Sequence, residues 1–267
     1  VIVRLNDDGT APTDNPFFAA GAAMGGEVGA NVQKLFAYGV RNSFGLAFDP
    51  EPGDLWEQEN GDDSFSELNR VEPGMNSGWV QIMGPASRVA QFKAIETTMG
   101  PTNDPFAPNG YFGLQQIRWP PTNIADSPEE ALERLFMLPG AHYSRPEMSW
   151  KFEVSPGGIG FVEGHGLGGN YRHDLIMGNA RPELAGGHLF HFNLSGDRRR
   201  IRVSDRRLRD GVADNRHKFD IQESESLLFG RNFGTVVDVK SGPNGNLYVV
   251  SLTHGNVYEI FRPRGRR

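Results

Sequence analysis

The stretch GLAFDPEPGDLW, residues 45–56, contains the pattern that decides the fold. An apolar run enters a turn rich in Pro, Gly and Asp, and a leucine followed by an aromatic residue restarts the apolar run. The same order returns in VVDVKSGPNGNLYVV (236–250), more loosely in residues 174–194, and SLTHGNVYEIF (251–261) adds a further strand–turn–strand unit. Hairpins in series predict antiparallel sheets, and units of this size favour a β-propeller.

Composition agrees with an all-β chain that forms a single propeller-type domain over residues 1–267. The 267 residues include 34 Gly and 18 Pro, so turns are frequent, and only 37% are hydrophobic. The net charge of −6 argues against nucleic acid or an anionic membrane as a partner. No apolar run is long enough to span a membrane, and the absence of Cys excludes disulfides and thiolate chemistry.

Two segments interrupt the hairpin pattern. Residues 84–149 are rich in Pro, Gly and Asn, and we interpret them as a long insertion over one face of the domain. They contain one expected helix, from Ser127 to about Met137, with Ser127 as N-cap and Pro128 at the first helical position. The charged stretch 198–226 is expected to be a solvated strand and loop, with a polyanion or partner site as the weaker alternative.

An acidic cluster follows the first hairpin. It consists of five carboxylates with Asn60 and Gly61 between them: Glu57, Glu59, Asp62, Asp63 and Glu67. Carboxylates and carbonyls in a tight loop suit a hard cation such as Ca²⁺. The spacing does not match an EF-hand, so a solvated acidic loop is an equal alternative on these residues alone.

Two further groups could bind a ligand. The pair Arg41-Asn42 could hold a carboxylate or a sugar hydroxyl, although a structural arginine between strands is the simpler interpretation. The aromatic residues Tyr111, Trp119, Tyr143 and Trp150 could stack on a flat cofactor or a sugar ring, or could form ordinary core. The sequence contains no GxSxG, HExxH, Walker A or GxGxxG pattern, and its seven histidines have no metal-ligand spacing.

Six segments in order resemble the soluble quinoprotein glucose/sorbosone dehydrogenases, the PQQ-dependent aldose sugar dehydrogenases. They are VIVRLNDDGTAPTDNPFF (1–18), YGVRNSFGLAFDP (38–50), LWEQENGDDSFSELNRVEPGMNSGWVQ (55–81), PEMSWKFEVSPGGIGFVEG (146–164), DLIMGNARPELAGGHLFHF (174–192) and VVDVKSGPNGNLYVV (236–250). The resemblance implies a six-bladed β-propeller, of which this chain matches the later blades, about four. It is then an incomplete propeller, expected to be a fragment, a processed chain, or a chain completed by a missing N-terminal segment or a partner.

The same resemblance implies an oxidoreductase that oxidises an aldose sugar at C1 with PQQ and Ca²⁺ and passes electrons to an external acceptor, in the periplasm or outside the cell. Arg41, Asn42 and Arg181 correspond to residues that bind PQQ. Gly61 and Asp62 correspond to the residues whose carbonyls hold Ca²⁺, with Asp63 and Glu67 in support, and Trp150 and Tyr143 are expected to face the sugar. No catalytic base is assigned, because the family's histidine precedes the segment that matches Val1.

The chain departs from the family where two arginines normally pair with PQQ carboxylates. Thr235 and Val237 stand there, and Arg231 lies four residues earlier. Each lost charge-assisted bond is worth roughly 1.5–3 kcal/mol. The departures favour, as alternatives, a non-redox propeller that binds carbohydrate or protein, or less strongly a Ca²⁺-assisted lactonase with Glu59 or Asp62 as base.

Overall fold

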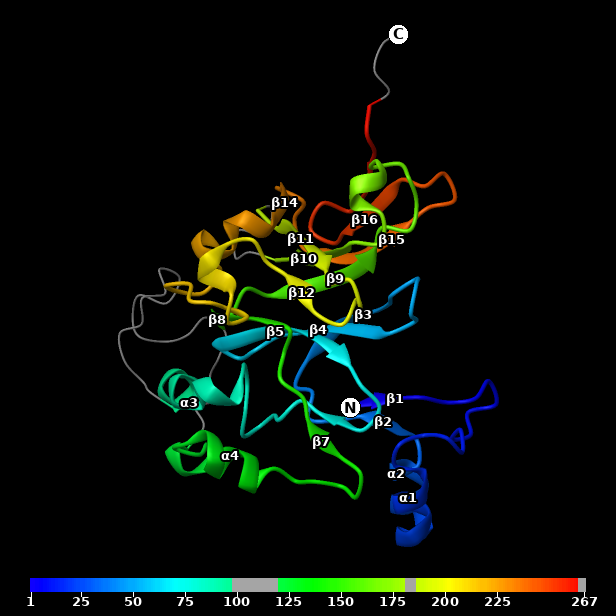
Figure 1. The fold of residues 1–267 in the computed structure, drawn as a ribbon, viewed down its shortest axis with the longest axis vertical. Coiled ribbons are helices and arrows are strands. Elements are labelled where there is room, and N and C mark those ends of the chain that lie inside the picture. Colours follow the sequence, from blue (N-terminus) through cyan, green and yellow to red (C-terminus); the bar gives the residue numbers. More distant parts are fainter. Residues whose placement is uncertain (98–119, 181–185, 264–267) are drawn as a thin grey trace.

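The computed structural model of the protein describes residues 1–97, 120–180 and 186–263, and most of its regular structure is β-sheet (Figure 1). The α-helices are α1 (Phe18–Met24), α2 (Gly26–Val32), α3 (Val89–Thr97) and α4 (Pro128–Arg134). The strands are β1 (Ile2–Val3), β2 (Leu35–Ala37), β3 (Ser43–Phe48), β4 (Leu55–Glu59), β5 (Ser64–Val71), β6 (Met75–Asn76), β7 (His142–Tyr143), β8 (Met148–Phe152), β9 (Pro156–Phe161), β10 (Leu175–Asn179), β11 (His188–Leu194), β12 (Ile201–Arg202), β13 (Val212–Ala213), β14 (Leu228–Arg231), β15 (Val236–Ser241), β16 (Leu247–Ser251) and β17 (Asn256–Ile260).

Three larger sheets and two small ones organise these strands. The larger sheets have the orders β13-β8-β5-β4-β3, β12-β11-β10-β9 with β14 also on β11, and β15-β16-β17. The small sheets are β1-β2 and β6-β7. Neighbouring strands are antiparallel except β13 with β8 and β6 with β7. The expectation of a mostly-sheet protein is confirmed, and within the described residues each sheet is open.

The hairpins expected from the repeated pattern are present. β3 and β4 pair around the turn after Asp49, with Ala47 opposite Trp56. β15 and β16 pair in the same way around the Gly-Pro-Asn-Gly turn, and β16 continues into β17 through the turn at Gly255. The looser copy forms β10 and β11. The alternation of apolar residues around Pro/Gly turns therefore located the strands correctly.

The sheets pack face to face around apolar cores. The sheets of β4 and β10 enclose a core that contains Trp56, Trp150, Phe190 and Phe192. The other side of the β10 sheet packs on the β15 sheet through Ile176, Leu189, Val239, Val249 and their neighbours. Burial of these apolar faces on both sides of the middle sheet is the main force that holds the sheets together.

Glycines in β9 allow adjoining sheets to approach closely. A Cβ atom at Gly157 would lie 2.1 Å from the carbonyl oxygen of Val236, and one at Gly160 would lie 2.0 Å from that of Val239. Both distances are far below van der Waals contact. The sequence PGGIGF at residues 156–161 is therefore required by the contact between β9 and β15.

The helices differ from the expectation in number and length. Ser127 caps α4 by accepting a hydrogen bond from the Glu130 amide at 3.2 Å, as predicted, but the helix ends at Arg134 because Leu135 is extended. α3 is a second helix in the segment 84–149, and α1 and α2 were not expected. No helix in the described parts of the chain has both the length and the apolar character needed to cross a lipid bilayer.

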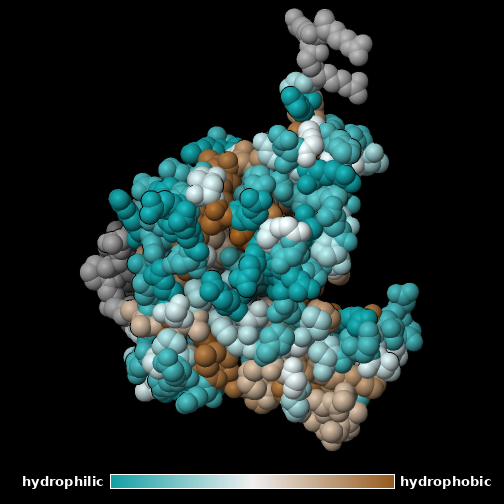
Figure 2. All heavy atoms as spheres, viewed as in Figure 1, coloured by the Kyte–Doolittle hydropathy of each residue, from teal (hydrophilic) through white to brown (hydrophobic). Residues whose placement is uncertain are grey.

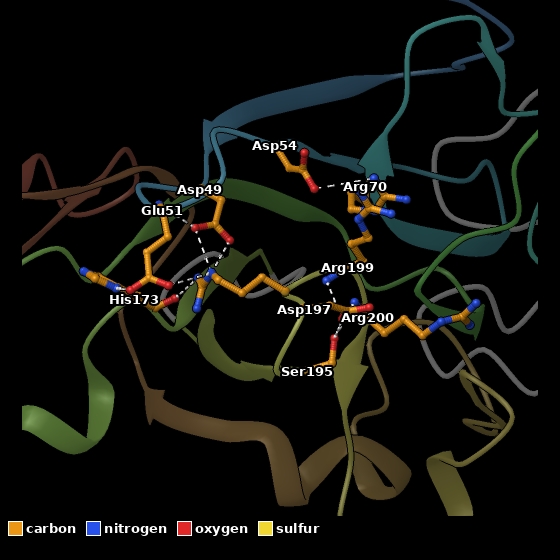
Figure 3. A network of polar contacts seen from close by, with 10 residues as sticks. Asp49, Glu51, Asp54, Arg70, His173, Ser195, Asp197, Arg199 and Arg200 are labelled. Atoms are coloured by element: carbon orange, nitrogen blue, oxygen red, sulfur yellow. Dashed lines mark hydrogen bonds and ion pairs between the residues drawn. The ribbon is translucent and has the colours of Figure 1, made fainter.

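A buried ion pair joins the turns at one end of the sheets (Figure 3). The Nε of Arg198, in the β11–β12 turn, donates to both carboxylate oxygens of Asp49 at 2.9 and 2.7 Å. The Nη2 of Arg198 donates to the carbonyl of His173 at 2.6 Å. Asp49 has no exposed side-chain surface and Arg198 keeps 15% of its own. This ion pair therefore ties the β3–β4, β9–β10 and β11–β12 turns together.

Asp49→Ala should lower the free energy of unfolding by about 2–3 kcal/mol. The substitution leaves the Arg198 charge unpaired, and the cost stays below that of a fully buried pair because Arg198 retains contact with water. Urea unfolding of the variant measures this. The control is Glu51→Ala, which removes an exposed carboxylate that contacts His173 and lies 3.8 Å from the Nε of Arg198, and it should cost less than about 1 kcal/mol. Equal losses in the two variants would contradict the conclusion that the Asp49–Arg198 ion pair holds the turns together.

Candidate functional site

Those predicted cofactor and metal residues that the structure describes gather at the opposite end of the β3–β4 hairpin from Asp49. Arg41 and Asn42 directly precede β3, and residues 60–63 form the turn between β4 and β5. The amide of Asn60 donates to the carbonyl of Asn42 at 3.0 Å, which brings these two segments together. The side-chain amide of Asn60 donates to the carbonyl of Pro156 at 2.9 Å, which fixes the turn against β9.

The Arg41 guanidinium lies where the oxygens of this turn converge. Its Nη1 donates to the carbonyls of Asn60 at 2.9 Å and Gly61 at 3.2 Å, and its Nη2 pairs with the carboxylate of Asp62. Burial lowers the pKa of Arg41, and the negative charges of Glu96 and Glu59 act in the opposite direction. Two carbonyls and one carboxylate of the 60–63 turn thus surround a positive charge.

A buried polar network holds this turn in place. Asp63, fully buried, pairs with the ammonium of Lys218 at 2.5 Å, and the Lys218 side chain is only 6% exposed. From α3, the carboxylate of Glu96 accepts hydrogen bonds from the amides of Asp63 at 3.0 Å and Ser64 at 2.9 Å. Burial raises the pKa of Glu96, and the nearby charge of Asp63 adds to this effect. The helix of the 84–149 segment therefore supports the candidate site.

Three further carboxylates lie buried on one face of β4 and β5. Glu57 and Glu59 alternate along β4, and Glu67 stands opposite Glu59 in the register. The side-chain amide of Asn69 bridges Glu57 at 2.7 Å and Glu67 at 3.0 Å, and Glu67 also accepts from the amide of Gly84. Burial raises the pKa of Glu57 to about 7 and that of Glu67 to about 8, and it raises the pKa of Glu59 well above its usual range. The acidic stretch is therefore not the solvated loop that one interpretation allowed.

The four residues predicted to hold a metal do not all share one partner. The Gly61 carbonyl and the Asp62 carboxylate contact Arg41, Asp63 contacts Lys218, and Glu67 contacts Asn69 and Gly84. In the described residues, no three side chains of His, Asp or Glu are placed to hold one metal ion. A cation at this site would accordingly depend on the backbone carbonyls of the turn.

The two aromatic residues predicted to face the sugar are covered. Trp150 is fully buried in the core between two sheets, and its Nε1 donates to the Ser224 hydroxyl at 3.0 Å. The Tyr143 hydroxyl accepts from the amide of Ala86 at 3.1 Å, and burial raises its pKa. Contact of either residue with a sugar stays a prediction. Tyr111 and Trp119 lie outside the described residues.

Only some of the residues predicted to bind PQQ lie in the described part of the chain. Asn42 is exposed beside Arg41, whereas Arg181 lies outside the described residues. Val236 of β15 lies against Gly157, so Thr235 and Val237 stand near the strand that the 60–63 turn contacts. Arg231 lies on β14 opposite His188, the third strand out from β9 in its sheet. Nothing in the described residues places the Arg231 guanidinium beside Thr235.

Three residues of the site were not identified from the sequence. Lys218 comes from the charged stretch 198–226, Glu153 comes from a segment quoted only for its resemblance to the family, and Glu96 comes from a helix that was not expected. Burial raises the pKa of Glu153, which lies near Lys218. The spacing of Glu57 and Glu59 was the one signal in the sequence that could have predicted their burial. Residues two positions apart lie on the same face of a strand.

Comparison with known proteins shows which family this part of the chain resembles. The family model described as Glucose / Sorbosone dehydrogenase matches residues 1–106, which include Arg41 and the 60–63 turn. The chain resembles the glucose/sorbosone dehydrogenases over this segment. It is 38% identical over 78 residues to Aldose sugar dehydrogenase YliI of Escherichia coli, covering 29% of this chain and 19% of that protein. It is 37% identical over 83 residues to Quinoprotein glucose dehydrogenase B of Acinetobacter calcoaceticus, covering 31% and 15%.

A solved structure extends the relationship along the chain. A crystal structure of glucose dehydrogenase superposes with a TM-score of 0.54 at 25% identity, covering 98% of this chain and 54% of the other. The resemblance to the glucose/sorbosone dehydrogenases expected from the sequence is confirmed. This chain spans about half the length of that structure, and its sequence matches cover less than a fifth of the two curated relatives.

Proposed function

We propose that this chain is the major part of a sugar dehydrogenase that oxidises an aldose at C1 with PQQ and Ca²⁺. Its relationship to the glucose/sorbosone dehydrogenases supports an oxidoreductase acting on sugars. The observation that carries the cofactor proposal is the convergence of the Asn60 and Gly61 carbonyls and the Asp62 carboxylate on one positive charge. That convergence lies within the segment that the family model matches.

The oxygens of the 60–63 turn fit a calcium ion. Carbonyl and carboxylate oxygens are the donors that Ca²⁺ takes in proteins, and the Arg41 guanidinium already stands in for a cation among them. For Ca²⁺ to bind these oxygens, the guanidinium has to leave them. It would then be free to pair with a carboxylate of PQQ, which is the role predicted for Arg41. When bound, PQQ and Ca²⁺ would supply a hydride acceptor and a Lewis acid.

The remaining anchors for PQQ are weaker than in the family. Asn42 is exposed beside Arg41 and can donate a hydrogen bond, and Arg181 is the second predicted cation. Thr235 and Val237 supply no charge where two arginines are expected. We therefore expect PQQ to bind this chain less tightly than a protein that keeps both arginines, by roughly 1.5–3 kcal/mol for each lost bond.

An apolar strip on β3 supports completion of the propeller by another sheet. Phe44, Leu46 and Phe48 expose 67%, 49% and 70% of their surface on the face of the sheet that carries Glu57. The β3–β4 hairpin points toward a hollow in the outline of the molecule, between the part with β15 and β16 and the part with β1, α1 and α2 (Figures 1 and 2). A further sheet, from a longer polypeptide or a partner chain, would cover the strip and complete a six-bladed propeller. Periplasmic or secreted location and an external electron acceptor belong to the same proposal.

Titration of the chain with PQQ, with and without Ca²⁺, tests the proposal. We expect Ca²⁺ to raise the melting temperature and PQQ to raise it further only when Ca²⁺ is present, because ligands stabilise the state that binds them. Aldose-dependent dye reduction is then measured in the same samples. Stabilisation by Ca²⁺ without any PQQ effect would favour the alternative of a propeller that binds carbohydrate without redox chemistry.

Single substitutions test whether Arg41 is responsible for the effect of PQQ on the melting temperature. Arg41→Ala should abolish the PQQ-dependent shift, whereas Arg207→Ala, which removes a surface arginine paired with Asp205, should leave it unchanged. The double variant Thr235→Arg/Val237→Arg restores the charges expected in the family and should strengthen PQQ binding. If the Arg41→Ala variant shows the same PQQ-dependent rise in melting temperature as the parent chain, Arg41 does not bind the cofactor.

A further inference from the structure

A small pocket opens at the other end of β8 from the candidate site. Its volume is about 170 Å³, and its walls come from residues 145–148, from Arg200, Ile201 and Val203, and from Leu208, Arg209 and Gly211. β8 has five residues, so the pocket and Glu153 are roughly 17 Å apart along the strand. The pocket is smaller than the 300–1,000 Å³ or so of sites for drug-sized ligands, and it therefore suits a small ligand.

Three arginines from separate segments line this pocket: Arg145, Arg200 and Arg209. The Nη2 of Arg145 donates to the carbonyl of Asp210 at 3.1 Å, which holds its guanidinium at the wall beside Gly211. Figure 3 shows the Arg200 side chain extending away from the Asp49 ion pair. Among the described residues, the guanidinium groups of Arg200 and Arg209 have no hydrogen bond or ion pair to a protein carboxylate within salt-bridge distance. Two of the three charges at this pocket are thus available to a ligand.

One carboxylate, Glu147, shares the pocket with these arginines. It is half-buried, and burial raises its pKa while the charges of Arg200, Arg70 and Arg145 lower it. Because one negative charge faces three positive ones, the lining residues have a formal charge of +2. This local charge contrasts with the net charge of −6 of the whole chain. A general excess of basic residues therefore does not explain the pocket.

We propose that the pocket formed by Arg145, Arg200 and Arg209 binds a tetrahedral oxyanion dianion, such as phosphate or sulfate. Guanidinium groups offer paired N–H donors that match two oxygens of such an anion, and they are less strongly hydrated than ammonium groups. Three donors on three segments can surround an anion from different sides. The charge of +2 matches a dianion better than a chloride or an acetate. The proposal is independent of sugar oxidation, so either can fail alone.

Isothermal titration of the chain with inorganic phosphate, at pH 8 and at an ionic strength fixed with KCl, tests the site. A constant ionic strength separates specific binding from screening of surface charge. We expect saturable binding with one site, the same competition by sulfate, and no competition by acetate. Binding that chloride or acetate reproduces would overturn the proposal, and competition by sulfate would support it.

Four variants locate the binding. Arg200→Gln and Arg209→Gln should each weaken phosphate binding about tenfold, since each removes a charge-assisted contact. Glu147→Gln should strengthen it several-fold, because it removes the one negative charge in the wall. Arg199→Gln, an exposed neighbour outside the pocket, is the matched control and should leave the affinity unchanged. If Arg199→Gln weakens binding as much as Arg209→Gln, or if Glu147→Gln does not strengthen it, the anion is not bound in this pocket.

Discussion

Replacing Lys218 with Met should lower the free energy of unfolding by about 3–5 kcal/mol. The ammonium of Lys218 lies 2.5 Å from Asp63, and both side chains are almost completely removed from water. Loss of the ammonium leaves the Asp63 carboxylate buried without its counter-ion, and Glu153 loses the same neighbouring charge. Removal of one partner from a buried pair typically costs this much, because the remaining charge loses its counter-ion in a place that water does not reach.

Urea unfolding at pH 7 measures the loss, with Lys240→Met as the matched control. Lys240 pairs with Asp238 at 3.8 Å on the surface, where 63% of its side chain is exposed, so its replacement should cost less than about 1 kcal/mol. The double variant Lys218→Met/Asp63→Asn should regain part of the lost stability, since it also removes the negative charge of Asp63. If Lys218→Met unfolds at the same urea concentration as Lys240→Met, the pair does not hold the 60–63 turn.

The hairpins could be predicted because their signal is local. A strand with one buried face alternates apolar residues, and a Pro/Gly turn ends it, so GLAFDPEPGDLW and VVDVKSGPNGNLYVV each specify a hairpin without help from the rest of the chain. The N-cap at Ser127 is equally local. The end of α4 was misplaced by three residues, since apolar residues 135–137 continue the helical pattern while the backbone at Leu135 is already extended.

The burial of the acidic residues could not be predicted from the local sequence. Residues 57–63 have the composition of a solvated or metal-binding loop, yet Glu57 and Glu59 belong to a strand and are fully buried. Their burial depends on Asn69, which donates to Glu57, and on Ser77, which donates to Glu59, and both come from other segments. Likewise, Lys218 stands 155 positions after Asp63 in the sequence, and only the tertiary fold brings them together.

In the candidate site, two groups that were each predicted to bind a ligand contact each other instead. Arg41 was expected to bind the cofactor, and the 60–63 turn was expected to bind calcium, but here they bind each other. The Arg41 guanidinium thus places a positive charge directly on these oxygens. The contact between the two predicted ligand groups is therefore consistent with a site whose oxygens are arranged for positive charge.

Stability should fall as the pH rises from 5 to 8, opposite to the usual behaviour of a protein rich in carboxylates. In the folded state the pKa of Glu57 is raised to about 7 and that of Glu67 to about 8, from a usual value of 4.5, and Glu59 is raised as well. Between these values the folded state binds more protons than the unfolded state, so the stabilising contribution is complete below pH 4.5 and is lost as the pH passes 7 to 8. Each titrating group contributes a slope of about 1.4 kcal/mol per pH unit.

Glu67→Gln tests this directly, because glutamine keeps the shape and the acceptor oxygen but cannot ionise. The variant should match the parent chain at pH 5 and be more stable at pH 8, by about 2 kcal/mol or more, when free energies of unfolding are measured in urea at both values. Glu163→Gln, at an exposed glutamate, should change neither value. A parent chain that is more stable at pH 8 than at pH 5, together with a Glu67→Gln variant that follows the same curve, would mean that the three carboxylates ionise at ordinary pH. Their negative charge would then have to be balanced by a cation, and the expected effect of Ca²⁺ on stability would become correspondingly larger.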